Sequence, residues 1–167
     1  MPNFMEQFVA EWYEFQGYFV RRNVRVGKLP KGGWKSELDV VAFNPEKKHL
    51  VHIEASVKVV SWPVLEKLVA AKFAAGRKYI PSLFPGLPLP ETQQIALVTT
   101  AGKDAPAALG GGKVLSLRNF MSEIRSDPEW GLAHRPFASM VPEQYVILRS
   151  LQYAAHYWNG PLPVLTG

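Results

Sequence analysis

The amino-acid sequence predicts an α/β fold in which helices flank a central mixed β-sheet. Segments with helical and strand periodicity follow one another in the order helix, strand, strand, strand, helix, strand, and shorter elements come after them. The 167 residues fit one domain. With 47% hydrophobic and 20% charged residues, the composition is that of a globular protein and excludes a disordered, collagen-like or coiled-coil chain.

The first predicted elements are a helix and a strand. Apolar residues recur at helical spacing over residues 3–16, where Asn3 is a suitable N-cap, Glu6 follows three residues later and a glycine ends the pattern. Residues 18–26 alternate aromatic or β-branched side chains with basic ones, which predicts a strand. The glycine-containing segment 27–33 is expected to be a mobile basic loop.

A β-hairpin is predicted next. Residues 37–43 form one strand, the turn 44–48 reverses the chain, and residues 50–58 form the other strand. Because side chains alternate with period two, the polar residues of the later strand share one face. These residues are His52, Glu54, Ser56 and Lys58. We interpret His52 as a sheet-face residue and not as a metal ligand.

A second helix and a buried strand complete the predicted core. Helical spacing runs from Ser61 to about Ile80, and the four prolines of segment 81–90 predict a loop. The apolar segment 94–100 is expected to be a strand buried inside the sheet.

Three more elements are predicted after the core. They are a strand at 113–117 and helices at 119–125 and 143–158. Since the sequence shows no internal repeat and no linker, we predict a single domain over residues 1–167. Its core spans about 3–100, and the strand and helices of 101–167 are appended to it.

Several functional classes are excluded by composition. The absence of cysteine rules out a disulfide framework, a thiolate zinc site, an iron–sulfur cluster and a cysteine nucleophile. No G-x-S-x-G elbow is present, which argues against a serine hydrolase. The apolar runs are shorter than a membrane helix requires and the N-terminus lacks a secretory pattern, so we expect a cytoplasmic protein with no membrane partner.

Positive charge is concentrated in one part of the chain. The net charge is +5, yet residues 20–80 contain thirteen Lys or Arg against five Asp or Glu. This asymmetry favours a polyanion-binding surface, with a merely solvated basic surface as the alternative. The residues expected to contact nucleic-acid phosphates are Arg21, Arg22, Arg25, Lys28, Lys31 and Lys35.

The acidic residues stand in a pattern that is similar to that of a known family. Glu37-Leu38-Asp39 opens the second predicted strand, Ile53-Glu54-Ala55-Ser56 closes the third, and an acid lies in the first helix. Over about residues 3–100 the chain resembles the PD-(D/E)xK nucleases, which have a restriction-endonuclease-like core in αβββαβ order. The segment from Glu6 to Gly17 also resembles the opening of archaeal Holliday-junction resolvases.

The resemblance implies a set of metal ligands. Asp39 and Glu54 match the two carboxylates that bind Mg²⁺ from adjacent strands, and Glu6 matches a third. Glu11 and Glu14 compete with Glu6 for that role. The chemistry supports this independently, because Mg²⁺ is a hard ion that takes one or two carboxylates together with substrate phosphate. The alternative for Asp39 is an acid that faces water or pairs with Arg22 or Lys35.

One position departs from the family pattern. Ser56 stands where the motif has a lysine, and Lys58 lies two residues further along the same strand face. We take Lys58 as the first candidate for the catalytic lysine, since two strand residues span about 6.6 Å. The other candidates are Lys35, Lys67 and Lys72.

These observations predict a Mg²⁺-dependent endonuclease that hydrolyses phosphodiester bonds in DNA, with Mn²⁺ as an expected substitute. The main alternative is a catalytically silent domain of the same fold that binds nucleic acid as a subunit or adaptor. A third reading is an unrelated α/β interaction protein with structural acids. A homodimer is left open. The aromatic residues of the last helix could form its interface, but we expect them to pack in the core. These are Tyr145, Tyr153, Tyr157 and Trp158.

Overall fold

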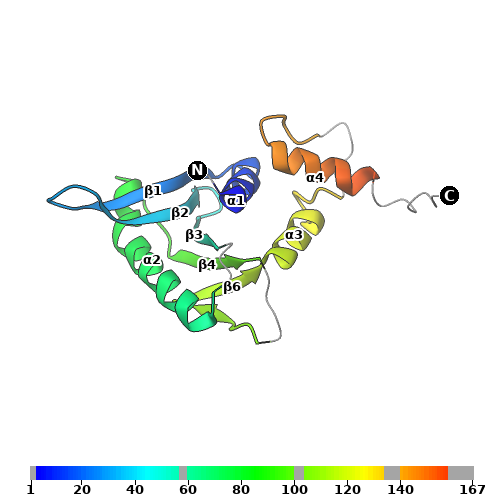
Figure 1. Ribbon diagram of the computed structural model, residues 1–167. Helices are drawn as coiled ribbons and strands as arrows, with labels where there is room; N and C mark the ends of the chain where they lie inside the picture. The colour runs from blue at the N-terminus through cyan, green and yellow to red at the C-terminus, as the bar shows by residue number, and fades with distance from the viewer. Residues whose placement is uncertain (1–2, 57–59, 100–103, 134–139, 158–167) are drawn as a thin grey trace. The chain divides into compact units, whose positions relative to one another are not determined.

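The fold is α/β, as predicted. The computed structural model describes residues 3–56, 60–99, 104–133 and 140–157 (Figure 1). The chain divides into two compact units, residues 1–118 and 119–167. The first unit thus extends past the predicted core boundary near residue 100, because two short strands that follow it join the sheet.

The first unit holds two helices and a six-stranded mixed sheet. Its elements are α1 (Phe4–Phe15), β1 (Phe19–Lys28), β2 (Trp34–Asn44), β3 (His49–Ser56), α2 (Trp62–Leu83), β4 (Thr92–Val98), β5 (Ala108–Leu109) and β6 (Gly112–Ser116). The strand order is β1-β2-β3-β4-β6-β5. β1, β2 and β3 are antiparallel neighbours, β4 is parallel to both β3 and β6, and β5 returns antiparallel to β6.

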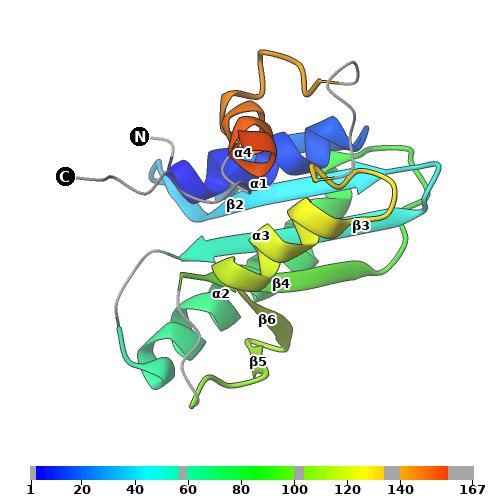
Figure 2. The same ribbon diagram turned by 90° about the vertical axis from the view of Figure 1, so that its right-hand side faces the viewer.

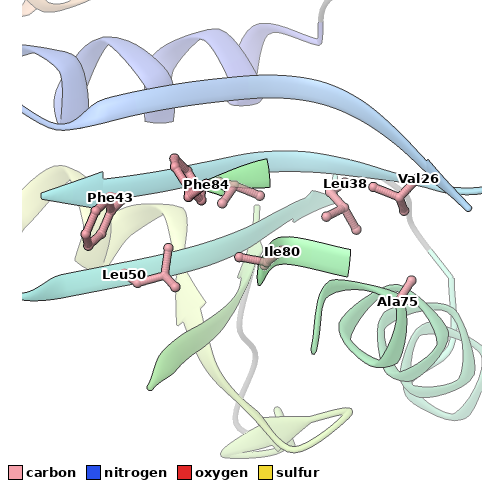
Figure 3. Packing of buried hydrophobic residues seen from close by; sticks show 8 residues of the cluster. Val26, Leu38, Phe43, Leu50, Ala75, Ile80 and Phe84 are labelled. Carbon is pink, nitrogen blue, oxygen red and sulfur yellow. The ribbon is translucent and has the colours of Figure 1, made fainter. Parts of the chain in front are cut away.

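Helices α1 and α2 lie on opposite faces of this sheet (Figures 1 and 2). The apolar side of α1 is buried, and α2 covers a hydrophobic cluster that draws on three strands (Figure 3). The residues of this cluster are Val26, Leu38, Val41, Phe43, Leu50, Ala75, Ile80 and Phe84. Each large apolar side chain buried there contributes about 1.5–3 kcal/mol, so this contact holds α2 firmly against the sheet.

The alternation of side chains is interrupted in the middle of β1 and β2. Leu38 and Val41 belong to the same cluster, although residues three apart on a regular strand face opposite sides. The ladder pairs Arg22 with Val40 and Val24 with Leu38, and Asn23 between them has a left-handed backbone with φ of 51°. This irregularity lies opposite Asp39, at the point where the candidate site begins.

Strands β1 and β2 are longer than predicted and pair in a hairpin, which was not predicted from the sequence. Segment 27–33 was expected to be a loop, but strand pairing continues to Lys28 and Trp34. Gly32 and Gly33 adopt φ of 90° and 84°, which only glycine takes readily, and this lets the chain reverse within a few residues. The hairpin therefore projects beyond the sheet as a paired, basic arm (Figure 1).

Helix α2 ends later than predicted. Ser61 is its N-cap and a proline lies in the first turn, as the sequence indicates. The helix then continues through Pro81 to Leu83, instead of ending near Ile80. A proline in the final turn removes one backbone hydrogen bond, and the buried contacts of Ile80 and Phe84 with the sheet hold the turn in place.

The second unit is small. Helix α3 (Leu117–Ser126) begins at its boundary, and α4 (Val146–Tyr157) is shorter than the predicted 143–158. The prediction that the C-terminal aromatic residues pack in the core is wrong for Tyr153 and Tyr157, which are 41% and 67% exposed and stack on each other. Trp158 lies outside the described residues. Within the described ranges, no helix is both long and apolar enough to span a bilayer.

Candidate functional site

Asp39 and Glu54 meet where β2 and β3 part. The antiparallel ladder reaches Val40↔Ile53, and beyond this pair side chains take over the hydrogen bonding. The Asp39 amide donates to Glu54 Oε1 at 3.3 Å, and the Ala55 amide donates to Asp39 Oδ2 at 2.9 Å. Both carboxylates are buried. The structure thus brings together the two acids that the strand pattern singled out.

Lys72 of α2 joins the two carboxylates. Its Nζ lies 2.5 Å from Asp39 Oδ1 and 2.5 Å from Glu54 Oε2. Lys72 thus forms an ion pair with each carboxylate, and its contact with Asp39 is also a hydrogen bond. Lys72 was one of four lysine candidates from the sequence. The alternative partners suggested for Asp39, Arg22 and Lys35, are not the ones it pairs with.

A cavity of about 340 Å³ opens beside these three residues. Elements α1, β2, β3 and α2 all contribute to its wall. The lining residues are Asn3, Glu6, Asp39, Glu54, Ala55, Leu65, Leu68, Val69, Ala71 and Lys72. The lining thus combines the charged side chains of Glu6, Asp39, Glu54 and Lys72 with apolar side chains of α2. Such a combination is common in sites that orient a ligand by a few polar groups.

Glu6 lies at the same cavity but is engaged elsewhere. It completes the capping box of α1 by accepting a hydrogen bond from the Asn3 amide at 3.4 Å. Asn3 in turn ties the start of α1 to β3, since its Nδ2 donates to the Ala55 carbonyl at 3.5 Å. Within the part of the chain that the structure describes, no three His, Asp or Glu side chains form a metal-binding group. A metal role for Glu6 stays a prediction.

The protonation of the site follows from burial and neighbouring charges. Burial raises the pKa of Asp39 to about 7, and the charge of Glu54 adds to this while Lys72 opposes it. Burial also pushes the pKa of Glu54 upward, but the hydrogen bond from His52 and the charge of Lys72 outweigh it, so that this pKa is lowered. Glu54 is therefore ionised at neutral pH, and Asp39 titrates near neutrality.

The pKa of Lys72 is raised in the same way. Burial alone would lower it, yet the charges of Glu54 and Asp39 have the larger combined effect. Lys72 thus carries a full positive charge between two carboxylates. The donor set suits Mg²⁺, because it consists of hard carboxylate oxygens from two side chains that already converge on one cation, the Lys72 ammonium.

His52 contributes more than the sequence suggested. It lies on the sheet face under α2, is fully buried, and makes a 2.8 Å hydrogen bond from Nε2 to Glu54 Oε1. The sequence signal for this contact is the two-residue spacing between His52 and Glu54, which puts both on one strand face. Asn3 was recognised only as a helix cap, and its link to the Ala55 carbonyl has no sequence signature.

The remaining predicted site residues fall outside this cluster. Lys58 and the side chain of Ser56 lie outside the described residues. Lys67 is exposed on α2. The six basic residues predicted to contact phosphates are all exposed and lie along the β1–β2 hairpin. Among them, Arg25 forms an ion pair with Glu37, with 3.2 Å between Nε and Oε2. Such an exposed pair contributes little to stability.

No family model matches the sequence, and no curated protein matches it. The functional inference therefore rests on the residues of the site.

Proposed function

We propose that this protein is a Mg²⁺-dependent nuclease that hydrolyses phosphodiester bonds in DNA and shares the restriction-endonuclease-like core of the PD-(D/E)xK nucleases. The observation that supports it most is the convergence of Asp39, Glu54 and Lys72 at one cavity. Two carboxylates and a lysine are the groups that metal-assisted phosphodiester hydrolysis needs. A cysteine-free chain suits the reducing cytoplasm, where we place this activity.

Asp39 and Glu54 are the residues that would hold the metal ion. Glu54 is already ionised, whereas Asp39, with a pKa of about 7, is partly protonated at neutral pH and would release that proton when a cation binds. Bound there, Mg²⁺ would lower the pKa of a coordinated water and stabilise negative charge on the scissile phosphate. Lys72 neutralises the two carboxylates in the metal-free protein, and a bound cation would share that role.

Lys72 takes the role of the motif lysine. It reaches the carboxylates from α2 rather than from β3, which compensates for the serine at position 56. The Lys72 side chain is about one-third exposed and lines the cavity. Because it is long and flexible, its ammonium could move from the carboxylates toward a substrate in the cavity. There the ammonium would donate to a phosphate oxygen or to the attacking water and stabilise the transition state electrostatically.

The β1–β2 hairpin is the proposed DNA-binding element. Its basic side chains are exposed; Arg25 pairs with Glu37, and the Arg21 guanidinium lies over the Phe84 ring. Trp34 on the same hairpin is 46% exposed. Basic and aromatic side chains on one projecting arm are suited to phosphates and unstacked bases.

Cleavage assays test the proposal. Wild-type protein with Mg²⁺ is incubated with duplex, junction, flap and single-stranded DNA, and with RNA. We expect cleavage of at least one DNA form, a loss of about 10²-fold or more in Lys72→Ala, and unchanged DNA affinity in that variant. Lys58→Ala and Lys67→Ala are the matched controls, since each removes the same charge. Loss of cleavage in Lys58→Ala with full activity in Lys72→Ala would refute the lysine assignment.

A catalytically silent nucleic-acid-binding domain is the second candidate. The observation that favours it is Ser56, which stands in place of the motif lysine. Under this alternative the wild-type protein binds duplex DNA but cuts no DNA form in Mg²⁺ or Mn²⁺. Absence of both binding and cleavage would leave neither candidate standing.

A further inference from the structure

His52 is surrounded in a way that leaves its ring one orientation. The imidazole is fully buried and packs edge-on against Phe73, with ring centroids 5.3 Å apart. Gly76 of α2 lies directly over it, and a Cβ at that position would come within 2.4 Å of Nδ1. A side chain this confined cannot turn over without moving the helix.

Gln94 determines which nitrogen of His52 carries the proton. Its Oε1 accepts a hydrogen bond from Arg77 at 2.5 Å, and its Nε2 donates to the Phe73 carbonyl at 2.9 Å. Arginine can only donate and a carbonyl can only accept, so these two contacts fix the orientation of the amide. The second hydrogen on Gln94 Nε2 is then directed at His52 Nδ1, and the two nitrogen atoms are 3.4 Å apart.

The tautomer of His52 follows from this chain of donors. Since Nδ1 faces a donor, it has to accept, and the ring proton is therefore on Nε2. Nε2 therefore donates to Glu54 Oε1 at 2.8 Å. Oε1 also accepts from the Asp39 amide, whereas Oε2 lies 2.5 Å from the Lys72 ammonium. One carboxylate oxygen is thus held by hydrogen bonds from His52 and the Asp39 amide, and the other already lies against a cation, the Lys72 ammonium.

We infer that His52 is a positioning residue, set in its tautomer by Arg77 and Gln94, that holds Glu54 with Oε2 presented to the divalent metal ion. This inference rests on the proposed function. Residues that orient a metal ligand from behind change metal affinity by about 10- to 100-fold when they are replaced. Arg77 is exposed at the surface of α2, so the chain of contacts runs from the helix surface to the buried ligand.

Two substitutions separate hydrogen bonding from packing. In His52→Gln the side-chain amide can place an N–H near the position of Nε2, whereas His52→Phe keeps a ring and removes the donor. We expect His52→Phe to bind Mn²⁺ at least 10-fold more weakly and to need a correspondingly higher Mg²⁺ concentration for half-maximal cleavage. His52→Gln should stay within a few-fold of wild type. Ile80→Val, a change elsewhere in the core, controls for lower stability.

The two proposals fail in different ways. Wild-type cleavage together with unchanged Mn²⁺ affinity in His52→Phe would overturn the positioning role and leave the nuclease standing. Mn²⁺ binding that depends on His52, without cleavage of any substrate, would overturn the nuclease and leave the positioning role standing. A wild-type protein that binds no Mn²⁺ would overturn both.

A measurement on the wild-type protein covers the case in which His52→Phe does not fold. Long-range ¹H–¹⁵N correlation spectra distinguish the two imidazole tautomers, and we expect the proton of His52 on Nε2. In Gln94→Leu, which lacks the donor to Nδ1, the preference for this tautomer should weaken. A proton on Nδ1 in the wild-type protein would overturn the inference without reference to activity.

Discussion

Asp39 is a buried acid whose proton affinity is raised by folding. Its pKa is about 7 in the folded chain, against 3.8 for an ordinary aspartate. Between these values the folded state binds more protons than the unfolded state. By linkage, the free energy of unfolding therefore falls as the pH rises through this window. The opposite contribution of Glu54, whose pKa is lowered, is lost only when the pH falls below its ordinary value of 4.5.

We therefore predict that the metal-free protein is less stable at pH 8 than at pH 5, by an amount on the order of a few kcal/mol. Asp39→Asn should flatten this dependence because it cannot ionise. Urea unfolding in EDTA at the two pH values measures it, and Glu37→Gln, at an exposed acid, is the control. An equal pH dependence in Asp39→Asn and wild type would contradict the burial of this carboxyl.

The acids of the site could be predicted from sequence, but their lysine could not be chosen. Asp39 and Glu54 stand out because acids in apolar strands need a partner, and a hairpin places the two strands together. Lys72 was only one of several candidates, because the sequence does not determine how a crossover helix is rotated above the sheet. The chain from Arg77 to His52 joins three elements, and no local pattern signals it.

At the scale of the element, the β1–β2 hairpin carries the prediction for DNA. Neutralising one exposed lysine that contacts a phosphate should reduce the slope of log K against log salt by about one unit. We expect this for Lys28→Gln and Lys31→Gln, measured by fluorescence anisotropy over a salt series. Lys113→Gln on β6 makes the same charge change away from the hairpin and should leave the slope unchanged. Equal effects at all three positions would point to net charge and not to the hairpin.

The boundaries of the elements show which local signals are reliable. The start of α2 was predicted because an N-cap and a following proline act locally. Its end was missed because Ile80 and Phe84 pack on the sheet and extend the helix past Pro81. The hairpin was missed for a related reason, since its pairing depends on two glycines whose positive φ the sequence permits without requiring.

At the scale of the whole molecule, metal binding should increase the free energy of unfolding and the Tm. A ligand that binds only the folded state at 100 times its Kd adds about 2.7 kcal/mol, which raises the Tm of a chain this size by about 5–10 °C. We expect Mg²⁺ to do this at pH 8 and to have less effect at pH 5, where Asp39 holds its proton. Differential scanning calorimetry with and without EDTA measures the shift. An equal shift in Asp39→Asn would show that the ion binds elsewhere.

The position of β1 has a consequence for the behaviour of the protein in solution. β1 is the outermost strand of the sheet, so one side of its backbone is open to pairing with another chain. Charged side chains along an edge strand hinder such pairing, and Arg21, Arg22 and Arg25 are exposed there. The opposite edge, β5, is protected by its length of two residues. We therefore expect the arginines of β1 to hinder aggregation, and replacing all three should give a protein that precipitates at concentrations where the wild type stays in solution.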